Sequence, residues 1–109
     1  MHLPTILYNN DFDLINYSEI ITLFKNSKVY YPNFYQKVTK VKQLDDNFEF
    51  SYGNNNTKIY MNRNNVQNEL NYIQEFEKTI FNNKILENYY YIDVRIQDQI
   101  IVKERSNIL

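Results

Sequence analysis

The sequence predicts an α+β domain in which a largely antiparallel sheet carries a short N-terminal helix and one longer helix packed on one face. Two observations predict this fold. Segments in which apolar and polar residues alternate, as in half-buried strands, are separated by short turns rich in Asn, Asp and Gly. One long segment instead repeats its apolar residues at helical spacing. Because strands outnumber helices and follow one another through short turns, we expect most neighbouring strands to run antiparallel.

The first third of the chain reads as an extended segment, a helix and an irregular connection. Residues 3–8 look extended. Asp11 and Asp13 are candidate N-caps of the helix. Residues 30–34, which contain a proline, are expected to be irregular or a single helical turn. The expected apolar stripe of the helix consists of Leu14, Ile21 and Phe24.

A three-stranded meander is expected next. Its strands are residues 36–44, 48–52 and 58–61, with turns at 45–47 and 53–56. The second turn contains the one glycine of the chain, which supplies a left-handed backbone position. The residues expected to face the core in the last two strands are Phe48, Phe50, Tyr52, Ile59 and Met61.

The best-defined helix follows the meander. We expect Asn64 to cap it and Gln67 to reach back as in a capping box. Its predicted apolar face consists of Val66, Leu70, Ile73, Phe76 and Ile80. Its predicted polar face includes Gln67, Asn68, Glu69, Asn71, Glu75 and Lys78.

The chain closes with two apolar segments, residues 89–96 and 99–104, which read as a hairpin with a short polar turn. Little sequence follows the second segment, so we expect it to end the sheet with an open edge. An open edge can accept a strand from another chain through backbone hydrogen bonds. The hairpin therefore favours binding over chemistry as the first hypothesis.

The composition of the chain further limits the classes of function to consider. The chain has 109 residues, which fits a single domain, and it has no cysteine, which excludes disulfides and thiol chemistry. Its net charge of −1 gives no overall attraction to nucleic acid. No apolar run approaches the ~20 residues of a membrane span, so we expect this chain to be soluble.

Catalytic motifs are not evident in the sequence. The single histidine, His2, lies at the terminus, and no phosphate-binding loop or metal-ligand spacing is present. We expect no enzyme activity, no catalytic or metal-binding residue, no cofactor and no small-molecule substrate. A small hydrolase would have only Asp93 and Asp98 in its favour, and these would need to pair in a cleft.

A second class of function is a domain that binds single-stranded nucleic acid. No acidic residue occurs between Glu19 and Asp45, and lysines there interleave with aromatic residues. A solvated, lysine-rich strand beside a Tyr/Phe core explains the same stretch, and the low net charge favours that explanation. The residues concerned are Lys25, Lys28, Tyr30, Tyr31, Phe34, Tyr35, Lys37, Lys40 and Lys42.

Several segments, in their order along the chain, carry a family resemblance. They are Leu3-Pro4 near the start, the apolar strand with its arginine at 58–63, the helix at 66–81, Ile92-Asp93-Val94-Arg95, and Ile100-Ile101-Val102. In this order the segments resemble those of the C-terminal β domain of the bacterial cell-division protein FtsQ, which is called DivIB in Gram-positive bacteria. The family's pattern has Gly where this chain has Asn62, a turn Gly where it has Gln99, and often an aromatic residue where it has Glu104.

The resemblance implies a non-catalytic divisome domain. Members of this family bind the FtsB–FtsL pair and link division proteins to septal peptidoglycan synthesis. The implied parent is a single-pass inner-membrane protein whose β domain lies on the periplasmic side at the division site. Residues 1–109 would then be one excised β domain, without the family's cytoplasmic tail, membrane helix and POTRA domain. No nucleic-acid partner is implied.

The resemblance also implies which residues contact the partner. The last strand of the family accepts a strand of FtsB, and nearby arginines pair with acidic residues of that partner. Arg63 matches the arginine after the apolar strand, and Arg95 matches that of Asp-x-Arg; without a partner, Arg95 could pair with Asp93 or Asp98 and Arg63 could cap a turn. The implied partner-binding residues are Arg63, Arg95, Ile96, Asp98, Ile100, Ile101, Val102, Lys103 and Glu104.

Overall fold

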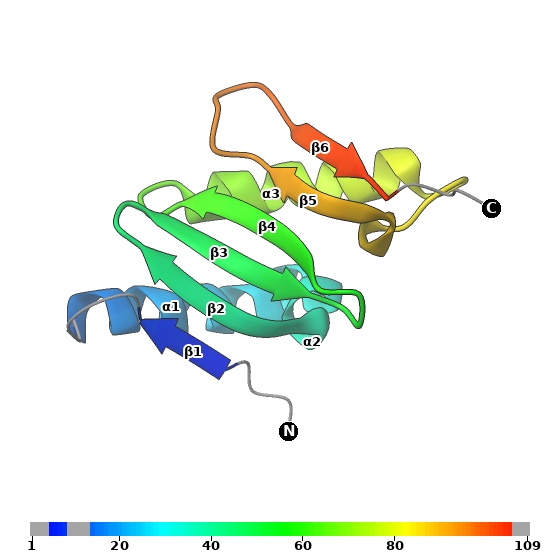
Figure 1. The fold of residues 1–109 in the computed structure, drawn as a ribbon. Helices are drawn as coiled ribbons and strands as arrows, with labels where there is room; N and C mark the ends of the chain where they lie inside the picture. The colour runs from blue at the N-terminus through cyan, green and yellow to red at the C-terminus, as the bar shows by residue number, and fades with distance from the viewer. Residues whose placement is uncertain (1–4, 9–13, 106–109) are drawn as a thin grey trace.

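The structure is a computed structural model that describes residues 5–8 and 14–105, with side chains from residue 19 onward. The described residues form α-helices, one short 3-10 helix and strands (Figure 1). In chain order these elements are β1 (Thr5–Tyr8), α1 (Leu14–Tyr30), α2 (Pro32–Lys37), β2 (Val38–Leu44), β3 (Asn47–Tyr52), β4 (Thr57–Asn62), α3 (Val66–Ile80), η1 (Leu86–Asn88), β5 (Tyr89–Asp93) and β6 (Ile101–Glu104).

The strands form one sheet in the order β1-β2-β3-β4-β5-β6. Three neighbouring pairs are antiparallel, whereas β1–β2 and β4–β5 are parallel. Each parallel pair is joined through a helix, and such crossovers are right-handed. Both crossovers step in the same direction between strands of the same orientation, so both helices must cover the same face. Figure 1 shows α1 and α3 together behind the sheet. The predicted α+β class, with a largely antiparallel sheet and helices on one face, is confirmed.

The central meander matches its prediction. Phe48, Phe50 and Tyr52 of β3 are fully buried, as are Ile59 and Met61 of β4. Phe48 is in register with Met61, and Phe50 with Ile59. Alternation along a strand therefore sends one set of side chains under the helices and leaves the other set on the opposite side of the sheet.

The N-terminal helix is longer than predicted. α1 has 17 residues against 15 for α3, so it is not the short helix of the pair. Its buried side chains include Ile20, Leu23 and Phe24, so Phe24 of the predicted stripe is confirmed, whereas Ile20 is buried in place of the predicted Ile21. The candidate caps Asp11 and Asp13 and the side chain of Leu14 lie outside the described residues.

Two details of α3 differ from the prediction, although its apolar face is confirmed by buried Leu70 and Ile73. The N-cap is Asn65, so the prediction of Asn64 is wrong. Glu69, predicted on the polar face, is 1% exposed. Its carboxylate accepts hydrogen bonds from the Asn62 backbone N–H at 2.6 Å and side-chain Nδ2 at 3.0 Å. A buried charge is tolerated there because these donors satisfy it.

Phe34 belongs to the core and lies in the segment expected to be irregular or a single helical turn, which forms the six-residue helix α2. Phe34 is fully buried, and its ring lies 5.7 Å from Tyr31, 5.4 Å from Phe50 and 6.1 Å from Tyr52, measured between centroids. Aromatic contacts of this kind add to the free energy of apolar burial. The short helix α2 is thereby fixed against β3.

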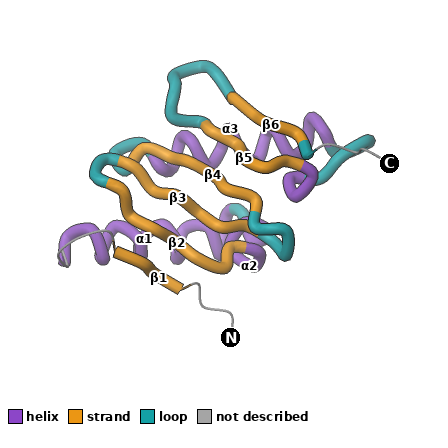
Figure 2. Tube along the Cα trace, in the orientation of Figure 1, coloured by secondary structure: helices purple, strands orange, loops and turns teal. Residues whose placement is uncertain are grey.

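The closing hairpin is present, but its connection is longer than predicted. β5 and β6 pair antiparallel, and residues 94–100 form the loop between them, which Figure 2 shows extending beyond the sheet. Asp98 in this loop has a left-handed backbone, with φ of 61°. None of the helices in the described ranges is both long enough and apolar enough to cross a membrane.

Candidate functional site

The outer edge of β6, meaning the side of Ile101–Glu104 that faces away from β5, is called the β6 edge here. In the part of the chain that the structure describes, β6 pairs with β5 alone, so its outer backbone groups have no strand partner. Ile101 is 38% exposed and Val102 is half-buried. The sequence-derived candidates Ile100, Ile101, Val102, Lys103 and Glu104 lie in or next to this strand.

The loop that leads into β6 exposes an apolar side chain. Ile96 is 48% exposed, and its carbonyl accepts a hydrogen bond from the backbone N–H of Gln99 at 3.1 Å. The left-handed residue of this turn is Asp98, although Gly would fit it without strain. Asp98 is exposed, so its side chain is open to solvent in this loop.

Arg95 lies just after β5 and is bound by Asp93, the last residue of that strand. Its Nε and Nη2 donate to the Asp93 carboxylate at 2.9 Å and 2.7 Å, and its guanidinium lies 5.0 Å from the centroid of the Tyr60 ring. Burial raises the pKa of Asp93, but the hydrogen bonds from Arg95 outweigh it and hold that pKa below its usual value. These contacts orient the Arg95 side chain against the sheet.

Arg63 lies on the other side of the sheet. Its Nε donates to the Glu19 carboxylate of α1 at 2.9 Å, and its side chain lines a cavity with Leu23 and Val66 on the helix side. Tyr60, which contacts Arg95, alternates with buried Ile59 and so lies on the face away from the helices. The structure thus separates Arg63 and Arg95 by the sheet itself.

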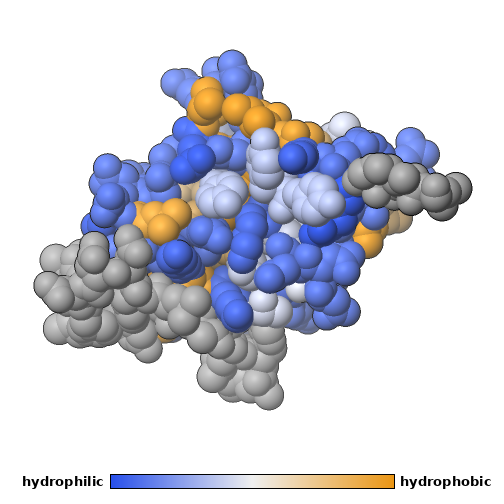
Figure 3. All heavy atoms as spheres, in the orientation of Figure 1, coloured by the Kyte–Doolittle hydropathy of each residue, from blue (hydrophilic) through white to orange (hydrophobic). Residues whose placement is uncertain are grey.

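The face of the sheet away from the helices is called the open face. It is mostly polar, with pale aromatic rings at its centre (Figure 3). The ring centroids of Tyr60 and Tyr91 lie 6.5 Å apart, and Lys58 donates to the Ser51 hydroxyl at 2.8 Å. Sequence reasoning missed this face as a unit. The sequence pattern that could have predicted it is the alternation of Lys and Tyr with apolar residues in β2 and β4.

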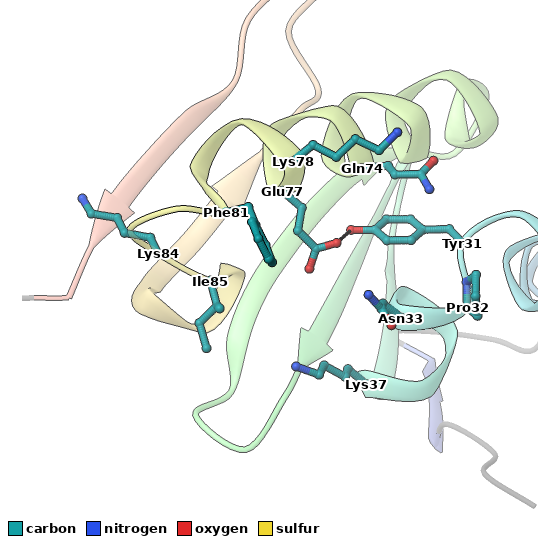
Figure 4. A pocket seen from close by; sticks show the side chains of 10 residues that line it. All are labelled: Tyr31, Pro32, Asn33, Lys37, Gln74, Glu77, Lys78, Phe81, Lys84 and Ile85. Atoms are coloured by element: carbon teal, nitrogen blue, oxygen red, sulfur yellow. Dashed lines mark hydrogen bonds between the residues drawn. The ribbon is translucent and has the colours of Figure 1, made fainter.

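A cleft of about 710 Å³ lies between α2 and α3 on the helix side (Figure 4). Across it the Tyr31 hydroxyl donates to the Glu77 carboxylate at 2.6 Å. Burial, together with the carboxylate of Glu77, raises the pKa of Tyr31. Lysines at the cleft already have acidic partners, since Lys37 binds Glu87 and Lys84 binds Glu104. The cleft therefore offers little uncompensated charge to a ligand.

The stretch from Lys25 to Lys42 does not form one continuous surface. Tyr31 and Phe34 are buried, so these aromatic rings are not available for stacking. Lys25 lies on α1, whereas Lys42 lies on β2, where it is exposed beside buried Val41. The lysines are thus divided between the helix side and the open face.

Asp93 and Asp98, the two carboxylates considered for a hydrolase, are not paired with each other in the structure. Asp93 is bound by Arg95, and Asp98 lies in the exposed turn. His2 lies outside the described residues. Among the residues that the structure describes, no cluster of three or more His, Cys, Asp or Glu could hold a metal ion.

No protein-family model matches this chain, and its sequence matches no curated protein.

Proposed function

We propose that this domain is a non-catalytic protein-interaction module that accepts a strand of a partner protein along the β6 edge. The observation that carries the proposal is the outer backbone of β6, which has no strand partner among the described residues and is flanked by exposed Ile96 and Ile101. Strand addition uses backbone groups for affinity and neighbouring side chains for specificity.

The length of β6 limits what backbone pairing can supply. A strand of four residues directs only about four backbone groups outward, since alternate residues share a side. At about 0.5–1.5 kcal/mol net per hydrogen bond, this is too little to offset the free-energy cost of association. Side chains must contribute the remainder, and Ile96 and Ile101 are the apolar groups placed to do so.

The resemblance to the FtsQ family supplies the first partner to test. On this proposal the β6 edge binds an FtsB-like division protein in complex with an FtsL-like one, on the periplasmic side of the inner membrane. Arg95 is the arginine placed to meet an acidic residue of that partner, because it lies in the loop leading to β6. Arg63, on the other face, is assigned to holding α1 through Glu19.

The test is an NMR titration of the labelled domain with the soluble outer segment of the cognate FtsB-like protein. We expect the largest amide shifts at Ile96 and along residues 101–104. The variant Ile101→Lys should weaken binding at least about tenfold, since it places a charge against an apolar contact. The control Val29→Lys, at a 70% exposed position of α1, should leave binding unchanged.

A spectrum without shifts at high partner excess would overturn the assignment of this partner. Shifts that instead gather on α1, or equal losses from both lysine variants, would overturn the placement of the site at the β6 edge.

A further inference from the structure

The open face carries a concentration of positive charge that the net charge of −1 conceals. On the described strands, and at the residues that follow β5 and β6, it presents six cationic side chains. Two of them are paired with acid, Lys58 with Glu49 and Arg95 with Asp93. The cationic residues are Lys40, Lys42, Lys58, Arg95, Lys103 and Arg105. Because the whole chain has a net charge of −1, its other residues together carry more acid than base.

Strand geometry places these side chains together. Lys40 and Lys42 flank fully buried Val41, so both point away from the helices. The Lys58 Nζ lies 3.5 Å from the Glu49 carboxylate. Lys103 is in register with Tyr91, so the two side chains share a face of the sheet. The cations therefore lie on β2, which is the second strand of the sheet, on β4 near its middle, and on the edge strand β6.

Three tyrosines lie among these charges. Tyr60 and Tyr91 contact each other edge to face, and Tyr90, at the irregularity in β5, is 46% exposed. The Arg105 guanidinium lies 4.6 Å and the Lys103 ammonium 5.8 Å from the centroid of the Tyr90 ring. A guanidinium that lies over a ring covers that face, so a base would stack on the guanidinium plane or on the other face of the ring.

We propose that the open face binds single-stranded nucleic acid, with bases stacked on Tyr60, Tyr90 and Tyr91 and phosphates over the flanking cations. Polyanions of this class carry both features that the face complements, a regular negative charge and exposed π-faces. An acidic peptide would use the charges but leave the rings unoccupied, and a duplex would withhold its bases from stacking. Arg95 and Lys103 are shared with the proposed β6-edge site, but the three tyrosines and the other cations are not, so either proposal can fail without the other.

The test is fluorescence anisotropy of the full chain with labelled 12-nucleotide oligothymidylate and oligouridylate, and with a 12-residue polyglutamate peptide. We expect both oligonucleotides to bind at low salt, with log affinity falling against log salt at a slope of about −2 to −4. Polyglutamate should bind at least about tenfold more weakly than either. A difference in affinity between the two oligonucleotides would show whether DNA or RNA is preferred.

Matched variants separate charge from stacking. Tyr90→Leu should weaken oligonucleotide binding by about tenfold without changing the salt slope, since base–ring stacking is lost but charge is kept. Tyr72→Leu, at a 37% exposed position of α3, should have no effect. Lys42→Gln should reduce the salt slope by about 0.7, while Lys25→Gln on α1 should not.

The lysine variants are exposed and should fold normally, so the proposal remains testable even if Tyr90→Leu is unstable. No binding of either oligonucleotide at low salt would overturn the proposal. So would polyglutamate binding as tight as that of the oligonucleotides and unaffected by Tyr90→Leu, a result that would assign the face to an acidic protein.

Discussion

At the scale of single residues, two buried tyrosines near the α2–α3 cleft differ in one hydrogen bond. The Tyr31 hydroxyl donates to Glu77 at 2.6 Å, whereas the buried Tyr52 hydroxyl has no partner within the described residues. Burial raises the pKa of both phenols, so both stay protonated near neutral pH. A buried donor without an acceptor lowers stability, while a satisfied one contributes to it.

These tyrosines give a paired prediction. Tyr31→Phe should lower the free energy of unfolding by about 1 kcal/mol, because it removes the hydrogen bond to Glu77. Tyr52→Phe should leave that free energy unchanged or raise it by about 1 kcal/mol, because it removes an unsatisfied hydroxyl. Urea denaturation followed by circular dichroism measures both. An equal loss in the two variants would mean that the Tyr52 hydroxyl does have a partner, such as a buried water.

At the scale of elements, the β3–β4 turn depends on a position that only glycine fits. Gly53 has φ of +71°, and a Cβ there would lie 2.6–2.8 Å from side-chain atoms of Glu87. The Glu87 carboxylate is itself held by Lys37 at 2.9 Å, so the side chain cannot move away without breaking that ion pair. The turn and the η1 segment thus approach each other at this glycine.

Gly53→Ala should lower the free energy of unfolding by about 1–2 kcal/mol from the left-handed backbone alone, and further through the clash. Asn56→Gly, at the other left-handed position of this turn (φ 62°), is the control and should change stability by less than about 0.5 kcal/mol. Thermal denaturation of both variants checks this. Adding Glu87→Ala to Gly53→Ala should recover the part of the loss that is due to the clash; no recovery would contradict a steric origin.

At the scale of the whole molecule, one side chain links the helix layer to the sheet. Phe34 of α2 contacts Tyr31, Phe50 and Tyr52, and it is completely buried. The sheet and the N-terminal helices therefore share a core that cannot be divided into separate folding units. Loss of this ring should affect the cooperative stability of the entire domain.

Phe34→Ala should lower the free energy of unfolding by about 3–5 kcal/mol, a large part of the ~5–15 kcal/mol that holds a domain together. Phe34→Leu should lower the free energy of unfolding by less, so that its unfolding transition can still be measured. Tyr30→Ala, at a 68% exposed position, is the control and should change little. Urea denaturation monitored at several backbone amides should give one shared midpoint for each variant. Separate midpoints for the sheet and helices would contradict the single core.

The local patterns in the sequence were sufficient for the meander, the apolar face of α3 and the existence of a closing hairpin. They were not sufficient for α2, for the burial of Glu69 or for the long loop before β6. Alternation and helical spacing describe neighbours within a few residues, so they identify an element and its apolar face. They do not describe a buried carboxylate whose donors come from the preceding strand, as those of Glu69 come from Asn62.

What the sequence by itself determined is the α+β class, the candidate edge strand and most of the core-facing residues of the meander and α3. What only the tertiary structure decided is which distant residues meet. It brought Tyr31 to Glu77 and Arg63 to Glu19, placed Arg63 and Arg95 on opposite faces, and gathered six cations on one face of a chain with net charge −1. The physical reason is that pairing between distant strands and helices follows from the free energy of the whole packed core, whereas periodicity records only which side of each element is apolar.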